Sequence, residues 1–174
     1  MGDATIKAVI IDAGPLIHLH EIDALHLLYA YEAIHIPDAV WFELTRPGRV
    51  DERDLLTFPN LRRHLVGEVE RTKFVQTHNL NHLQRGEQEC LYLCHQSGIN
   101  LLLTDDLAAR KAAQRLGVYP AGSLGVIARA YWQGKIGQEE AAGLMRKLHR
   151  TSSLFVTEEI VDIAIERLMK NRIE

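Results

Sequence analysis

The chain has few of the residues that mark several classes of protein. Only two of its 174 residues are cysteines, Cys90 and Cys94, and a pair four positions apart in one helical segment is too small for a disulfide framework. No apolar run is long enough to span a membrane, and the N-terminus lacks a basic stretch followed by a leader-length apolar run. We therefore expect a cytoplasmic protein with no membrane segment, whose cysteines form a reduced pair in the core.

The chain also has no excess of positive charge. The 20 Lys and Arg residues face 23 Asp and Glu residues, which gives a formal net charge of −3 and argues against broad, non-specific coating of nucleic acid. Residues 46–85 are nevertheless locally basic, with eight Lys and Arg against five Asp and Glu. The simplest interpretation of this stretch is a solvated helical surface, although it also leaves room for a local basic groove.

Apolar runs alternate with helix-like segments along the chain. We expect strands at residues 7–12, 33–36, 72–76 and 99–103, with a minor strand at 118–119. We expect helices at 15–31, 38–45, 86–96, 107–116, 123–132, 138–148 and 157–170, and helical turns at 51–56 and 62–66. This alternation predicts an α/β fold with a parallel sheet covered by helices. The length fits one domain, 1–174, with a core of about 5–135 and a helical C-terminal part of about 136–174.

Two of the expected strands are followed by aspartate. Asp12 follows the apolar run 8–11, and Asp105 and Asp106 follow the run 101–104. The carboxyl ends of parallel strands meet at the edge of the sheet where α/β proteins bind ligands. Carboxylates gathered there repel one another unless a cation or a proton holds them. The placement therefore predicts a metal site.

Two expected helices carry an acid where a core residue would be usual. Glu87 lies one turn before Leu91 on an apolar stripe, whereas Glu89 falls near the opposite face. We therefore interpret Glu87 as the inward acid and Glu89 as an ordinary solvent-exposed one. Glu43 lies one turn after Val40 and faces inward or along an edge. Carboxylate oxygens of this kind suit Mg²⁺ or Mn²⁺, and the scattered histidines form no zinc pattern.

Three other kinds of site fail on spacing. A haloacid-dehalogenase phosphatase requires a second aspartate two positions after the first, where this chain has Gly14. A response-regulator receiver has its acidic pair near the first strand, whereas here the pair follows the fourth. A dinucleotide site needs a glycine-rich turn after the first strand, and Asp12-Ala13-Gly14-Pro15 is not one.

Four segments occur in an order and at a spacing that resemble the PIN-domain nucleases, and within them the VapC-like group. They are residues 9–17, 36–44, 86–90 and 101–110, and the similarity continues through 117, 121–126 and 134–136. No single motif is specific, but the ordered set of four is, and it covers nearly the whole chain. The resemblance implies a three-layer α/β/α PIN-like domain with a central, mainly parallel sheet and a helical C-terminal extension.

The resemblance also implies a function. It implies an endonuclease that cleaves single-stranded RNA with four catalytic acids, which by position are Asp12, Glu43, Glu87 and Asp106. One or two Mg²⁺ or Mn²⁺ ions would be held by Asp12, Glu87, Asp105 and Asp106. The candidates for substrate binding are Arg110 and Lys111, which could hold a phosphate, and Thr104, whose hydroxyl could support the ligands.

The partners and the alternatives follow from the same resemblance. A VapC-like toxin implies a small antitoxin protein that fills the acidic cleft, and a homodimer. Ala13 and Gly14 depart from the pattern, because many relatives have hydroxyl residues there. Two alternatives to the ribonuclease stay open, namely a non-catalytic PIN-like module that binds nucleic acid or protein, and a structure-specific DNA nuclease.

Overall fold

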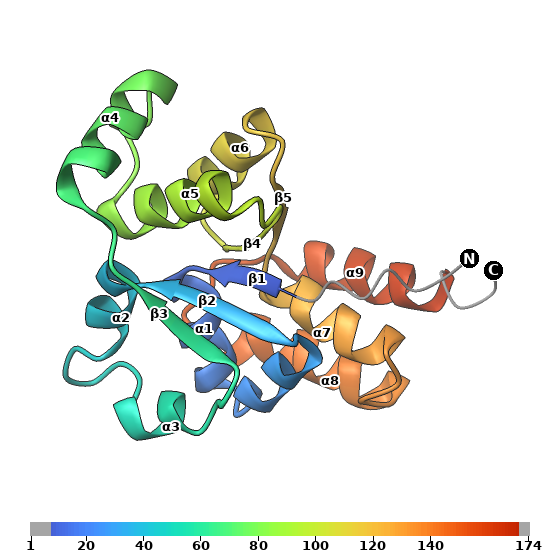
Figure 1. Cartoon of the computed structure of the whole chain (residues 1–174). Coiled ribbons are helices and arrows are strands. Elements are labelled where there is room, and N and C mark those ends of the chain that lie inside the picture. The colour runs from blue at the N-terminus through green and yellow to red at the C-terminus, as the bar shows by residue number, and fades with distance from the viewer. Residues whose placement is uncertain (1–7, 171–174) are drawn as a thin grey trace.

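A computed structural model describes residues 8–170 and has a five-stranded, all-parallel sheet at its centre (Figure 1). The strand order is β3-β2-β1-β4-β5. The strands are β1 (Ala8–Ile11), β2 (Ala33–Pro37), β3 (Leu61–His64), β4 (Leu101–Leu103) and β5 (Tyr119–Ala121). Lys7, the expected first residue of the first strand, lies outside the described residues. The predicted α/β fold with a parallel sheet is confirmed.

Helices cover both faces of this sheet, which gives the predicted three layers. On one face lie α5 (Arg85–Ser97) and α6 (Leu107–Arg115), with α4 (Glu68–His78) packed on α5. The other layer holds α1 (Ala13–Glu21), the 3₁₀ helix η1 (Leu25–Ala30), α7 (Ser123–Trp132) and α8 (Gln138–Thr151), and α9 (Glu158–Lys170) packs on α7 and α8. Between β2 and β3 lie α2 (Asp38–Leu44), which contacts both α1 and α5, and α3 (Glu52–Leu56).

The order of the strands reverses between β1 and β4. The chain builds β1, β2 and β3 toward one edge and then returns to place β4 on the other side of β1, where Ile11 pairs with Leu103. Such a reversal opens a crevice at the carboxyl ends of the two strands, which is the usual place for a ligand in this kind of sheet. The backbone N–H of Asp12 donates to the carbonyl of Leu103 at 2.9 Å, so Asp12 is fixed at this crevice.

The third strand is not where the sequence pattern predicts it. Residues 62–66 were expected to form helical turns, but 61–64 form β3, which pairs with β2 at the edge of the sheet. Arg62 and Arg63 are exposed there, so this edge strand has no apolar alternation that could identify it. Its place is set by pairing with β2, where His64 lies against His35 with ring nitrogens 2.8 Å apart.

The segment 72–76, expected as a strand, is instead the middle of α4. Its preference for strand is overridden by tertiary packing, because Phe74 and Val75 are both buried and Phe74 meets the Tyr92 ring of α5 edge-on. The helix ends at Asn79, whose left-handed backbone (φ 55°) is a common way to terminate a helix.

Smaller differences concern boundaries. Residues 15–31 were expected to form one helix, but α1 and η1 are separated by a turn in which Asp23 has φ 59°. The last strand begins at Tyr119 rather than Val118. Cys90 and Cys94 are buried and free, as predicted. From residue 8 to residue 170, no helix is both long and apolar enough to cross a membrane.

Candidate active site

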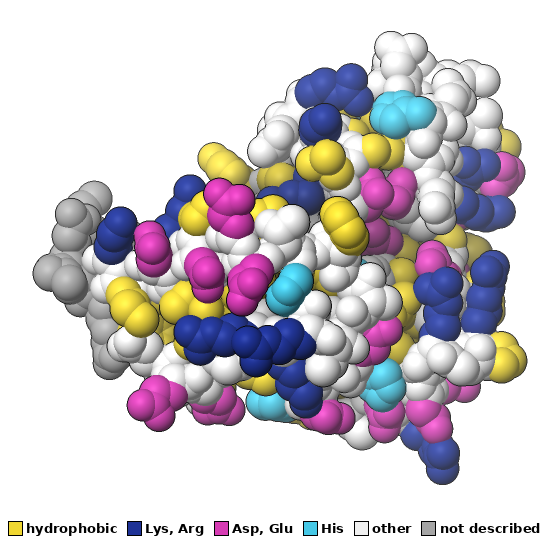
Figure 2. All heavy atoms as spheres, turned by 180° about the vertical axis from the view of Figure 1, so that it is seen from behind, with side chains coloured by type: hydrophobic (Ala, Val, Ile, Leu, Met, Phe, Trp, Pro, Cys, Tyr) yellow, Lys and Arg dark blue, Asp and Glu magenta, His cyan; other side chains and the backbone are white. Residues whose placement is uncertain are grey.

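A cavity of about 300 Å³ opens at the carboxyl ends of β1 and β4. All the acids that the sequence marks as candidates contribute to its lining: Asp12, Glu43, Glu87, Asp105 and Asp106. They come from four regions of the chain, and the strand order brings them together. Figure 2 shows acidic side chains in the hollow between the layer of α4 to α6 and the rest of the molecule, with Lys and Arg side chains to its right.

Asp12 lies deepest among these acids. It is the residue before α1, and only 8% of it is exposed. The hydroxyl of Thr104 donates to its Oδ2 at 3.0 Å. The pKa of Asp12 is raised from 3.8 to about 6. Burial is the largest cause, and the charges of Glu43 and Asp106 add to it, whereas the hydrogen bonds from Ala13 and Thr104 partly offset it. The carboxylate therefore lies where negative charge is disfavoured.

Glu87 is held at the start of α5. Its Oε2 accepts the backbone N–H of Gln84 at 2.9 Å, and the side chain of Gln84 accepts a backbone N–H in return, which makes a capping box. The pKa of Glu87 is raised from 4.5 to about 7, chiefly by burial and also by the charges of Asp106, Asp12 and Glu43, against the lowering effect of the hydrogen bond from Gln84. The capping box fixes this acid, and Glu87 lines the same cavity as the other acids.

Asp106 and Thr104 tie the end of β4 to this cluster. Asp106 begins α6, and its Oδ1 accepts the backbone N–H of Ala109 at 2.7 Å. The backbone N–H of Asp106 in turn donates to the hydroxyl of Thr104 at 3.3 Å. Thr104, a candidate for substrate binding whose hydroxyl was expected to support the ligands, is fully buried, and its hydroxyl joins Asp106 to Asp12. In this structure Thr104 therefore holds the acids in position.

Asp105 has partners for both of its oxygens. Oδ2 accepts from the hydroxyl of Ser123 at 2.6 Å and lies 2.7 Å from Nδ1 of His18, and Oδ1 accepts the backbone N–H of Ser123 at 2.8 Å. His18 and Ser123 were not predicted as partners of Asp105, since they lie 87 and 18 positions from it in the sequence. No local pattern could have paired them with it.

Glu43 and Asp12 flank one small space beside Gly86. A Cβ atom on Gly86 would lie 3.8 Å from both Oε2 of Glu43 and Oδ1 of Asp12, and only 3.1 Å from a methyl group of Val40. A glycine at this position therefore keeps open the space that the two carboxylates share. Glu43 is also paired with Arg49, at 3.3 Å.

The family is shown by comparison with known proteins. A family model described as a PIN domain (DUF3368) matches residues 8–170. The chain belongs to the PIN-domain family. PIN domains are generally metal-dependent nucleases that bind nucleic acid. No curated protein matches the chain.

One acid of this PIN domain differs from its prediction. Glu89 was expected on the solvent face of its helix, but it is 2% exposed. It accepts a hydrogen bond from Nε of Arg85 at 2.8 Å and another from the backbone N–H of Ala39 at 3.3 Å. The prediction was wrong because α5 is covered on two sides, by the sheet and by α2, and a single apolar stripe shows only one of them.

The predicted phosphate ligands do not line the acid cavity of the PIN domain. Arg110 donates from Nη1 to the carbonyl of Thr104 at 3.2 Å and lines an apolar groove between α7 and α9. Lys111 is exposed on α6. A role for either residue in binding RNA stays a prediction.

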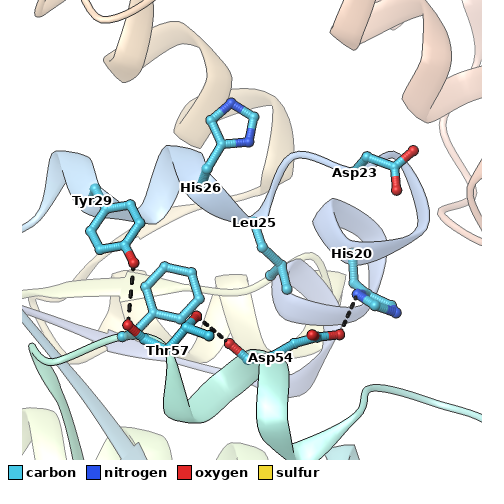
Figure 3. Close-up of a pocket in the computed structure, with 8 residues that line it drawn as sticks. His20, Asp23, Leu25, His26, Tyr29, Asp54 and Thr57 are labelled. Carbon is cyan, nitrogen blue, oxygen red and sulfur yellow. Dashed lines mark hydrogen bonds and ion pairs between the residues drawn. The ribbon is translucent and has the colours of Figure 1, made fainter.

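A second cavity, of about 340 Å³, lies between η1 and α3 (Figure 3). His20 is turned toward Asp54, with Nδ1 and Oδ2 3.9 Å apart, and Tyr29 donates to the carbonyl of Thr57 at 3.2 Å. Here the carboxylates are exposed and do not crowd one another. Over the described range 8–170, no three His, Cys, Asp or Glu side chains are positioned to hold a metal ion in either cavity.

Proposed function

We propose that this PIN domain is a divalent-metal-dependent endoribonuclease that cleaves single-stranded RNA with Asp12, Glu43, Glu87 and Asp106. The observation that carries the proposal is the crowding of these carboxylates in one cavity, where burial and mutual repulsion raise the pKa of Asp12 and Glu87. Groups that are costly to ionise together are stabilised by a cation between them.

The chemistry of the donor set fits Mg²⁺ or Mn²⁺. All four groups are carboxylates, the hard oxygen ligands that these ions prefer, and the buried thiol of Cys90 is kept protonated because its pKa is raised well above the ordinary value. A bound divalent ion supplies neutralisation of the phosphoryl oxygens and a lowered pKa of water.

Each residue has a part in this proposal. Asp12, Glu87 and Asp106 would hold the ion once their side chains rearrange around it, because no three acids of the described residues are positioned around one ion in this structure. Glu43 would complete the set from α2. Thr104 orients Asp12 and Asp106 through the two hydrogen bonds of its hydroxyl. Asp105 was predicted as a further ligand, but the bonds to its two oxygens favour a supporting role, in which it joins α1 to the start of α7 through His18 and Ser123.

A single strand fits the entrance of the cavity better than a duplex does. Phe155, in the loop between α8 and α9, lines the cavity and is 97% exposed. A fully exposed aromatic ring can stack on an unpaired base, and the bases of a duplex are not free to do so. The loop is anchored by Ser153, whose backbone N–H donates to Glu21 at 2.6 Å. RNA as the substrate, a toxin role, a small antitoxin that fills the cavity and a homodimer are predictions from the family resemblance.

The test is cleavage of a labelled single-stranded RNA with Mg²⁺ or Mn²⁺, alongside single-stranded DNA and duplex RNA of the same sequence. We expect cleavage of the single-stranded RNA by the unaltered protein, none with EDTA, and none by Asp12→Asn. Cleavage that survives Asp12→Asn would refute the assigned site. Binding of RNA with no cleavage of any substrate would favour a non-catalytic module.

A further inference from the structure

A larger cavity, of about 540 Å³, lies directly beside the acid cavity. The two share Glu43, Gln84 and Gly86 in their linings, so they form one continuous groove. We call the second cavity the arginine groove, because Arg46, Arg49 and Arg85 contribute to its walls. The walls come from α2, the turn after it, the segment after β3 and the start of α5.

Most charges of the arginine groove are paired within the protein. Arg49 pairs with Glu43 at 3.3 Å, and Arg85 pairs with the buried Glu89 at 2.8 Å. Asp38, the remaining acid of the lining, lies 3.0 Å from Arg63. Each acid that lines the groove is therefore neutralised by an arginine partner.

Arg46 is the exception. Its side chain is exposed, and the guanidinium forms no hydrogen bond or ion pair with another residue of the described segment 8–170. It follows the end of α2, only three positions after Glu43. One wall of the groove therefore carries an uncompensated guanidinium next to the catalytic acids.

An apolar surface accompanies this charge. Phe42 lines the same groove and is 62% exposed, and the guanidinium of Arg63 lies 5.7 Å from its ring centroid. A cation beside an exposed aromatic ring is the combination that binds the phosphate and the base of a single strand.

We propose that the arginine groove is a phosphate-binding subsite for single-stranded nucleic acid, with Arg46 as its principal ligand. A strand whose scissile phosphate lies at the four acids would continue past Gly86 into this groove. This path of the strand rests on the proposed function, which places the scissile phosphate at the four acids. It also explains how an acidic protein can hold a polyanion, since the locally basic stretch 46–85 supplies Arg46, Arg49 and Arg85 to one surface.

The test measures binding rather than cleavage. Fluorescence anisotropy gives the Kd of a labelled 12-nucleotide single-stranded RNA at several salt concentrations, with Asp12→Asn as the background so that the RNA stays intact. We expect Arg46→Ala to weaken binding several-fold and to lower the salt slope by about 0.7, the value for one phosphate contact on a single strand. Arg46→Lys should keep the slope, because it keeps the charge.

Arg53→Ala is the matched control. Arg53 is an exposed arginine on α3 that pairs with Asp51 at 2.6 Å and lies outside the groove. Three results would overturn the subsite: an equal loss of RNA affinity in Arg53→Ala, an unchanged salt slope in Arg46→Ala, or no binding of RNA by the Asp12→Asn background protein. If the unaltered protein fails to cleave RNA while Arg46→Ala still lowers the slope, the proposed function falls and the subsite stands. If the unaltered protein cleaves RNA and Arg46→Ala leaves the salt slope unchanged, the subsite falls and the proposed function stands.

Discussion

The acid cavity and the cavity of Figure 3 are alike in size but differ in electrostatics. Both combine Asp and His side chains, in volumes of about 300 Å³ and about 340 Å³. In the acid cavity Asp12 is 8% exposed and its pKa is raised to about 6. In the other cavity the side chains of Asp23 and Asp54 are 91% and 50% exposed. Buried, mutually repelling carboxylates thus distinguish the candidate site, and the size of the cavity does not.

The histidine–aspartate pairs of the two cavities differ in the same way. His18 and Asp105 lie 2.7 Å apart with side chains only 13% and 10% exposed, and their contact joins α1 to the end of β4. His20 and Asp54 lie 3.9 Å apart with 35% and 50% exposure. An exposed pair of this kind contributes little to stability, because water screens it.

The largest difference between the two cavities should be in catalysis. Asp12→Asn should lower the rate of RNA cleavage by roughly a thousandfold or more, since it removes a charged ligand, and this corresponds to about 4 kcal/mol of transition-state stabilisation. Asp54→Asn removes an aspartate of the other cavity and should leave the rate unchanged. Single-turnover cleavage of single-stranded RNA measures the rate of each variant. Equal rates in Asp12→Asn and Asp54→Asn would contradict the assignment of catalysis to the acid cavity.

The second difference should appear in the pH dependence of stability without metal. The pKa values of Asp12 and Glu87 are about 6 and about 7 in the folded protein, above their ordinary values of 3.8 and 4.5. Their ionisation therefore disfavours folding, and the free energy of unfolding should fall as the pH rises from about 4 to about 7. Asp12→Asn should make this fall smaller by up to about 3 kcal/mol.

Urea unfolding in EDTA at pH 4, 6 and 8 measures that effect. Asp54→Asn, in which the replaced carboxylate is exposed, should follow the unaltered protein. A steeper fall in Asp12→Asn than in the unaltered protein would contradict the assigned repulsion.

The third comparison uses two threonines. Thr104→Val removes the hydroxyl that joins Asp12 to Asp106 and should reduce cleavage by about 10- to 100-fold, as the loss of a group supporting a metal ligand does. Thr57→Val removes a hydroxyl of the other cavity, which donates to the carbonyl of Asp54, and should have no effect on cleavage. Circular dichroism confirms that both variants fold, and a fully active Thr104→Val would show that its hydroxyl is dispensable.

The smallest effect concerns the exposed aromatic rings. Phe155→Ala should raise the KM for single-stranded RNA by about 5-fold or more if one base stacks on the ring, while kcat changes less. Phe155→Trp should restore KM. Tyr29→Ala, at the other cavity, should leave both constants unchanged. An unaltered KM in Phe155→Ala would remove the stacking contact from the account.

Much of the site was predictable because strand ends and helix phase are local properties. The apolar runs before Asp12 and Asp105 located the crevice. The position of Glu87 on the apolar stripe of its helix, one turn before Leu91, singled out this acid. The burial of Glu89 was not predictable, since it depends on the packing of α2 against α5. The third strand was missed for a related reason, because the charged β3 is defined by its pairing with β2.

Direct titration with Mn²⁺ tests the central claim that the four carboxylates form a divalent-metal centre. Isothermal titration calorimetry at pH 7.5 compares the unaltered protein with Asp12→Asn and Asp54→Asn. We expect Mn²⁺ to bind the unaltered protein and Asp54→Asn with the same affinity, and to bind Asp12→Asn at least about tenfold more weakly. Equal affinity of Asp12→Asn and the unaltered protein, or weakened binding in Asp54→Asn alone, would contradict the claim.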